Sequence, residues 1–140
     1  PERIRKPEDL SGKVVATQTG TKYVDALEAL DKKLEAAGKD GLNIQTYPKA
    51  TDATAALLVG RVAAVLTQDT EAAFRMTQQK GKFAIAYLYP EFDTFGVYFR
   101  RGDRAVGPAL RAAFAKLKAN GTLKRIAVKH NLPLKSFGLK

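Results

Sequence analysis

Residues 13–38, KVVATQTGTKYVDALEALDKKLEAAG, decide the fold class of this chain. The first five, KVVAT, form a β-branched run after the turn residues Ser11 and Gly12, and this pattern predicts a strand. From Lys22 onward the apolar residues take helical spacing, and Gly38 supplies a stop signal. The apolar stripe of this helix consists of Val24, Leu27, Leu30, Leu34 and Ala37. A strand followed at once by an amphipathic helix is typical of α/β proteins.

The same alternation of strand and helix continues toward residue 88. Three further runs predict strands at residues 42–47, 62–66 and 83–88. Residues 62–66 are continuously apolar, which is typical of a strand buried on both faces. A short helix capped by Asp52 or Thr51 and closed by Gly60 is expected before them, and a helix over residues 70–79 after them. This order predicts an α/β fold with a doubly wound, mainly parallel sheet.

The last part of the chain departs from this alternation. Residues 94–100, TFGVYFR, form one more extended segment, and Gly102-Asp103 turns the chain. Two amphipathic helices are expected next, the first ending at Asn120-Gly121 and the second capped by Thr122. Their apolar faces hold Val106, Leu110, Ala113, Phe114 and Leu117 in the first helix, and Leu123, Ile126, Ala127 and His130 in the second.

The composition is that of an ordinary globular domain with an excess of positive charge. The 140 residues are 45% hydrophobic and 27% charged, and the formal net charge is +10. This balance excludes a wholly disordered chain, and no apolar run approaches the roughly 20 residues of a membrane span. Because the chain has no cysteine, disulfides and thiolate metal sites are excluded as well.

The positive charge is concentrated near the C-terminus. Residues 100–140 contain 11 Lys and Arg and a single acid, Asp103, whereas residues 1–99 contain 13 basic and 13 acidic residues. Such asymmetry suggests a nucleic acid, a membrane surface or an acidic partner. Residues 123–132 are similar to the first half of a helix-turn-helix, but the remaining chain is too short for a recognition helix.

Two loops that follow predicted strands carry candidate binding residues, since ligands of open α/β sheets bind at the carboxyl ends of strands. In residues 18–22, QTGTK, Gly20 permits close approach, and the Thr21 hydroxyl and the helix start attract an anion. The alternative is that Thr19 or Thr21 only caps the helix. Asp69 follows the third strand, where it either receives an ammonium group or caps the next helix.

Signatures of catalysis are missing from the sequence. His130 is the only histidine, and it is distant in sequence from any candidate nucleophile. The P-loop, the dinucleotide fingerprint and the G-x-S-x-G motif are all absent. We therefore expect no catalytic residue, no metal and no cofactor.

Five short stretches follow one another in a characteristic order. They are residues 7–14 (PEDLSGKV), 18–21 (QTGT), 60–65 (GRVAAV), 95–103 (FGVYFRRGD) and 117–122 (LKANGT). In this order the chain resembles family 3 extracellular solute-binding proteins, the polar amino-acid receptors of bacterial ABC transporters. The resemblance covers essentially all 140 residues.

The resemblance implies one lobe of a two-lobed receptor that holds its ligand between two α/β lobes. Residues 1–93 would be the second lobe, residues 94–103 the hinge with its returning strand, and residues 104–140 helices that pack on the first lobe. That N-terminal lobe, which supplies an Arg for the ligand's carboxylate, has no counterpart in these residues, so a fragment is implied. The implied partners are the missing lobe, the ABC permease at the membrane, and a second copy in a domain-swapped or self-associated dimer.

Single residues receive roles through the same resemblance. Thr21 falls on the family's carboxylate-binding Thr, Gln18 on a position that reaches the ligand in some members, and Lys22 replaces a second Thr or Gly. Gln68 falls on the Asp that takes the ligand's ammonium group, and Asp69 lies one residue later. With Gln68 in that role the ligand should be more anionic than a simple zwitterion, whereas a one-residue insertion would restore the role to Asp69.

The function implied is that of the solute-binding component of an ABC importer. It is non-enzymatic and periplasmic or extracytoplasmic, takes a polar amino acid or related small carboxylate, uses no nucleic acid, and binds weakly as an isolated lobe. One alternative is a basic nucleic-acid-binding module. Another is a dehydratase-like enzyme on the same fold, for which only Asp69 and Lys22 are available as acid or base.

Overall fold

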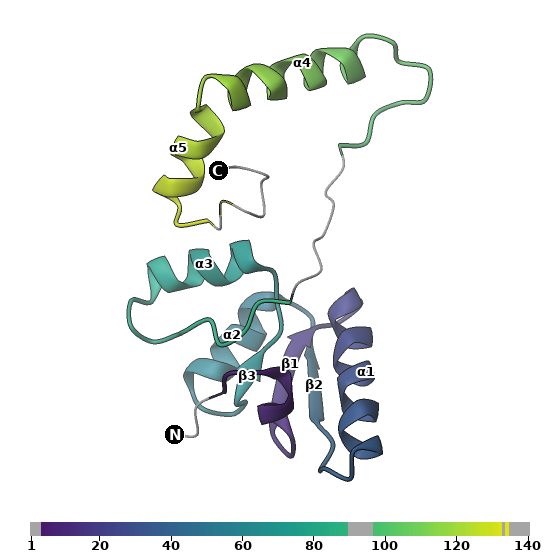
Figure 1. Cartoon of the computed structure of the whole chain (residues 1–140), viewed down its shortest axis with the longest axis vertical. Coiled ribbons are helices and arrows are strands. Elements are labelled where there is room, and N and C mark those ends of the chain that lie inside the picture. The colour runs from purple at the N-terminus through teal and green to yellow at the C-terminus, as the bar shows by residue number, and fades with distance from the viewer. Residues whose placement is uncertain (1–3, 90–96, 133, 135–140) are drawn as a thin grey trace. The chain divides into compact units, whose positions relative to one another are not determined.

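The structure, a computed structural model, describes residues 4–89, 97–132 and 134 (Figure 1). Contacts within the chain gather into two units, residues 1–88 and residues 89–140. The expected three-part division at residues 93 and 103 stays a prediction. Residues 94–96 of the expected hinge lie outside the described residues.

A three-stranded parallel sheet forms the centre of the first unit. Its strands are β1 (Val14–Gln18), β2 (Asn43–Tyr47) and β3 (Ala64–Val65), in the order β2-β1-β3. All five residues of β1 pair with β2. Only Val15 and Ala16 pair with β3, opposite Ala64 and Val65. The predicted α/β class with a parallel sheet is confirmed.

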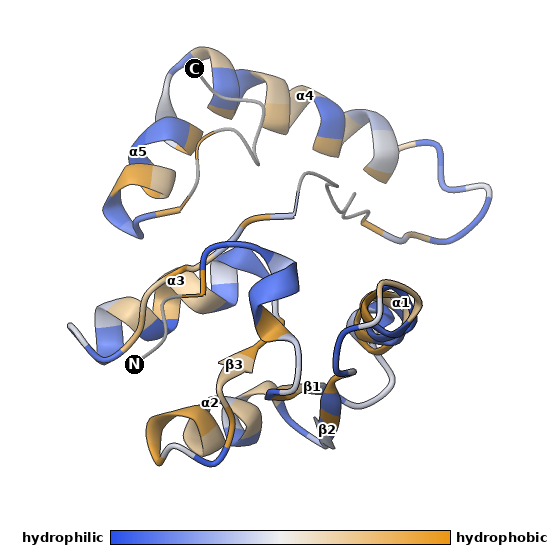
Figure 2. Cartoon of the chain, turned by 60° about the horizontal axis from the view of Figure 1, so that its bottom comes forward, coloured by the Kyte–Doolittle hydropathy of each residue, from blue (hydrophilic) through white to orange (hydrophobic). Residues whose placement is uncertain are grey.

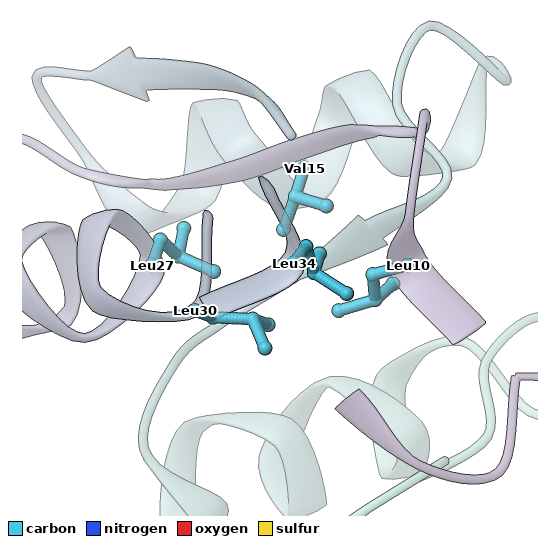
Figure 3. Packing of buried hydrophobic residues seen from close by; sticks show 5 residues of the cluster. All are labelled: Leu10, Val15, Leu27, Leu30 and Leu34. Atoms are coloured by element: carbon cyan, nitrogen blue, oxygen red, sulfur yellow. The ribbon is translucent and has the colours of Figure 1, made fainter. Parts of the chain in front are cut away.

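Helices cover both faces of this sheet (Figure 2). Helix α1 (Lys22–Ala36) packs on one face and α2 (Ala50–Leu58) on the other, and α3 (Asp69–Gln78) follows β3 in the chain. One core cluster consists of Leu10 from the 3₁₀ turn η1 (Pro7–Leu10), Val15 of β1, and Leu27, Leu30 and Leu34 of α1 (Figure 3). The other consists of Ala16, Ala53, Ala56 and Val62. Because neighbouring residues of a strand face opposite sides, β1 is buried between α1 and α2, and the sheet is doubly wound as predicted.

Glycine ends α1 and α2 at the positions that the sequence indicates. Gly38 has φ 68°, and its N–H donates to the Glu35 carbonyl at 2.9 Å. The Lys39 N–H donates to the Leu34 carbonyl at 3.0 Å. Gly60, with φ 73°, closes α2 in the same way. This pair of hydrogen bonds satisfies carbonyl groups in the last turn of a helix. The residue after the helix must adopt a left-handed backbone conformation, which favours glycine.

The predicted fourth strand is wrong, because residues 83–88 form no strand among the described residues. Phe83 is half-buried and residues 84–88 are exposed. Their apolar and β-branched character suits a strand, but a strand also needs a partner edge of matching length. Here β3 is only two residues long, so its outer edge offers few backbone groups for pairing.

Two other expectations for this unit need correction. Only Ala64 and Val65 of the predicted strand 62–66 pair with β1, and both are half-buried rather than buried, although each packs against one core cluster. Helix α2 begins directly after Lys49, so neither Thr51 nor Asp52 caps it. Both lie in its first turn instead, where the Asp52 carboxylate complements the positive end of the helix dipole.

The second unit contains α4 (Val106–Ala119) and α5 (Thr122–Lys129), as the sequence predicts. Gly107 of α4 is buried, and a Cβ at this position would lie 2.8 Å from Cζ of Phe99. The described part of the last extended segment, residues 97–100, forms no strand. Thr122 is the first residue of α5 and not its cap, because Gly121 occupies the cap position. The Asn120 side-chain oxygen accepts the Thr122 N–H at 3.0 Å.

Asp103 holds the start of α4 in place. Its Oδ1 accepts the N–H groups of Ala105 and Val106, both at 2.9 Å. These backbone hydrogen bonds hold the pKa of the Asp103 carboxyl below its usual value. A lowered folded pKa means that the stabilisation is present above the usual pKa of an aspartate and disappears as the pH falls through the lowered value.

We expect acid to release this turn. On titration from neutral to acid pH, the amide proton resonances of Ala105 and Val106 should shift together at a pH below the usual aspartate pKa. Asp103→Asn keeps an acceptor oxygen but has no proton to gain, so it should remove the transition and keep the helix. NMR titration of both proteins checks this, and an unchanged transition in Asp103→Asn would contradict it.

Candidate functional site

The candidate residues lie at one edge of the sheet, where β1 and β3 end. Gln18 is the last residue of β1, and Thr21 and Lys22 stand at the start of α1. Gln68 and Asp69 stand at the start of α3, three and four residues after the end of β3. Because β1 and β3 are paired and parallel, their carboxyl ends meet at the same edge. The structure therefore places the two predicted loops next to each other along the sheet.

Hydrogen bonds hold the loop after β1 against the end of β2. The Thr19 N–H donates to the Tyr47 carbonyl at 2.8 Å, and the Gln18 side-chain amide donates to the Pro48 carbonyl at 3.3 Å. Gly20 has φ 71°, and an added Cβ would meet nothing within 4 Å, so its surroundings are open. This openness is compatible with the close backbone approach that the sequence suggests.

Thr21 occupies the cap position of α1 without acting as a side-chain cap. Its hydroxyl donates to the Gln18 carbonyl at 2.7 Å, and it accepts no helix N–H. Capping by the Thr21 side chain is therefore the wrong alternative. The bond instead fixes the turn between β1 and α1, with the hydroxyl half-buried.

The start of α3 does not have the Asp69 cap that the sequence offered as an alternative. Gln68 is the cap residue, in an extended conformation, and makes no side-chain cap. Asp69 is the first helical residue, so the expectation that it caps α3 is wrong. The next carboxylate, Glu71, accepts from Nε of Arg75 at 2.8 Å. Both Gln68 and Asp69 are half-buried at this edge.

This edge of the sheet carries electrostatic charge of both signs. All three helices of the unit begin here, because α1, α2 and α3 each follow a strand of the parallel sheet. Their positive dipole ends therefore share the edge, and Lys22 adds a formal charge. Carboxylates in the first turns add negative charge: Asp25 in α1, Asp52 in α2, and Asp69 and Glu71 in α3. Because both signs of charge are present, the edge can receive a molecule that has a carboxylate and an ammonium group.

Sequence reasoning overlooked Thr17 at this edge. Thr17 is the only buried polar residue among those described, with 0% of its surface exposed. Its hydroxyl donates to the carbonyl of Leu66 at 2.9 Å, across from β1 to the segment after β3. The available signal was a polar residue inside the apolar run of residues 13–17.

The described residues contain no group of three or more His, Asp or Glu side chains that could hold a metal ion. Within the same residues, no helix combines the length and apolar character needed to cross a membrane.

Comparison with solved structures identifies the fold. An ancestral arginine-binding protein bound to arginine is 24% identical, with a TM-score of 0.68, and the match covers 92% of this chain and 55% of that one. Substrate-binding domain 2 of Lactococcus lactis GlnP, in an open conformation, is 24% identical with a TM-score of 0.69, over 93% of this chain and 53% of that one. This is the fold of one lobe of a periplasmic binding protein.

A third binding-protein structure matches in the same way. It is the second substrate-binding domain of a putative amino-acid ABC transporter from Streptococcus pneumoniae, 21% identical, with a TM-score of 0.65 over 92% of this chain and 56% of that one. The chain spans about half the length of these structures. No family model and no curated protein matches the sequence.

Proposed function

We propose that this chain is part of the solute-binding component of an ABC importer, and that it binds a polar amino acid or a related small carboxylate. The observation that carries the proposal is the meeting of two polar loops at the carboxyl edge of paired strands, on a binding-protein fold. Solved structures of this fold hold arginine in one case and glutamine in another. Lobe closure around the solute, outside the cytoplasm, would present it to a membrane permease.

Each loop has its own part in the proposed site. The loop of Gln18, Thr21 and Lys22 receives the ligand's carboxylate, supported by the start of α1 and the open surroundings of Gly20. Gln68 and Asp69 receive its ammonium group, supported by their position at the start of α3. A carboxylate compensates a partly desolvated ammonium far better than an amide does, which favours Asp69 for a zwitterionic ligand.

The second unit supports a role as a packing surface for a further lobe. Phe114 of α4 and Ile126 of α5 belong to the predicted apolar faces, and they are 52% and 47% exposed. Large exposed apolar residues on amphipathic helices are typical of a surface that another part of the protein covers. The proposed occupant is the first lobe of the complete receptor, with a second copy of the chain as the alternative.

Calorimetry on two forms of the protein tests the proposed function. The intact natural protein and this 140-residue chain are titrated with arginine, glutamine, glutamate and a dicarboxylate lacking the amino group. We expect the intact protein to bind one of these compounds with a Kd of about 10 μM or below, and the chain alone about 100-fold more weakly. The reason is that closure supplies contacts from both lobes. Absence of binding by the intact protein would contradict the proposed function.

A further inference from the structure

The ladder between β1 and β3 stops short of the candidate site. Its last pair is Ala16 with Val65, and the Leu66 N–H then donates to the Ala16 carbonyl at 2.9 Å. In a parallel ladder the next bond would use the carbonyl of Leu66. Instead, that carbonyl accepts a hydrogen bond from the Thr17 hydroxyl at 2.9 Å. A side chain therefore makes the hydrogen bond that follows the last backbone hydrogen bond between β1 and β3.

The environment of Thr17 fixes this bond in one arrangement. The side chain is fully buried, with Val15 and Ala16 beside it in β1 also buried. A buried hydroxyl without a partner costs free energy, so burial favours the conformation in which it donates. The bond joins positions 49 residues apart in sequence.

The position of the bond connects it to the proposed site. Thr17 directly precedes Gln18, the first residue of one loop. Leu66 stands two residues before Gln68 and three before Asp69, in the other loop. The bond therefore joins the end of β1 to the segment after β3 directly before the two loops that would hold the two ends of a ligand.

We infer that Thr17 is a positioning residue: its hydroxyl sets the distance between the carboxylate-binding loop and the ammonium-binding loop. This inference rests on the proposed function for its effect on ligand binding. Its effect on the loops themselves does not require a ligand. Thr17 itself makes no contact with the solute in this scheme.

Two pairs of proteins test the hydroxyl alone. Thr17→Val is compared with the unchanged protein and Thr17→Ala with Thr17→Ser, so the members of each pair differ mainly by one hydroxyl. All variants are made in the intact natural protein. If Thr17→Val does not fold, the Ser and Ala pair still gives the answer. Val15→Ala serves as a control that weakens the buried core without touching the hydrogen bond.

Amide hydrogen exchange provides the measurement that needs no ligand. We expect loss of the hydroxyl to speed exchange of the Leu66 amide about tenfold. The Thr19 amide, which bonds to Tyr47 on the other side of β1, should change less than twofold. Thr17→Ser should keep the protection of Leu66. Equal loss at Leu66 and Thr19, or no loss at either, would overturn the inference.

Calorimetry with the amino acid that the protein prefers provides the second measurement. Loss of the hydroxyl should raise Kd about tenfold, whereas Thr17→Ser and Val15→Ala should stay within about threefold. A rise in Kd for Val15→Ala as large as that for Thr17→Val would show a merely structural role and overturn the inference. If the intact protein binds no amino acid, the proposed function fails, and the exchange measurement alone decides the role of Thr17.

Discussion

Replacing Leu34 by alanine should lower the free energy of unfolding of the first unit by about 3 kcal/mol. Leu34 is 1% exposed and packs with Leu27 and Leu30 of α1 against Val15 of β1 (Figure 3). The substitution removes three buried carbons and leaves a cavity between α1 and the central strand, which the close packing cannot fill completely. Urea denaturation followed by circular dichroism measures the change.

The same substitution at an exposed leucine is the control. Leu58, the last residue of α2, is 39% exposed, and Leu58→Ala should cost less than about 1 kcal/mol. Both substitutions make the same chemical change in a helix, so the difference between them measures burial. Equal losses would show that Leu34 does not belong to the core on which β1 rests.

Replacing Asp69 by asparagine in the intact natural protein should weaken binding of a zwitterionic amino acid about 30-fold. The substitution keeps the size of the side chain but leaves the ligand's ammonium group without an opposite charge in a closed cleft. The folded lobe should be little affected, because Asp69 is only half-buried in the first turn of α3. Calorimetry with the preferred amino acid measures the change in Kd.

Substitutions at two neighbouring residues distinguish the proposed role of Asp69 from a general effect of charge. Glu71→Gln removes a carboxylate two residues away that already pairs with Arg75, and it should change Kd less than about threefold. Gln68→Ala tests the other candidate. If Gln68→Ala weakens binding more than Asp69→Asn does, the ammonium role belongs to Gln68, and the protein should then prefer glutamate or a dicarboxylate to a neutral amino acid.

Local sequence patterns predict the helices well and the sheet less well. The buried residues Leu27, Leu30 and Leu34 of the predicted α1 stripe and the stops at Gly38 and Gly60 are confirmed, because helix periodicity and left-handed glycine are properties of neighbouring residues. Ala37, the last residue of that stripe, follows the helix and is exposed. The strand predicted at residues 83–88 is absent, because a strand depends on a partner from elsewhere in the chain. The short β3 illustrates the same point, since only Ala64 and Val65 find partners within an apolar run of five.

The sequence likewise predicted the location of the candidate site but not the role of each residue in it. Parallel strands that end in Gln18 and before Gln68 must bring their loops to one edge, so the neighbourhood follows from the alternation of strands and helices. The detailed roles did not follow. Thr21 suggested a side-chain cap, yet its hydroxyl donates to the Gln18 carbonyl. Which hydrogen bond a threonine makes depends on the backbone that surrounds it, and spacing does not describe that backbone.

By itself, the sequence determined an α/β chain with a doubly wound parallel sheet, two further helices, and a net positive charge confined to residues 100–140. These features depend on periodicity, glycine positions and charge, all of which act over a few residues. Only the tertiary structure decided that β1 is the central strand, that Val15 and Ala16 face different cores, and that the Thr17 hydroxyl continues the β1–β3 ladder. Each of these depends on contacts between residues far apart in sequence, where burial selects one partner among many.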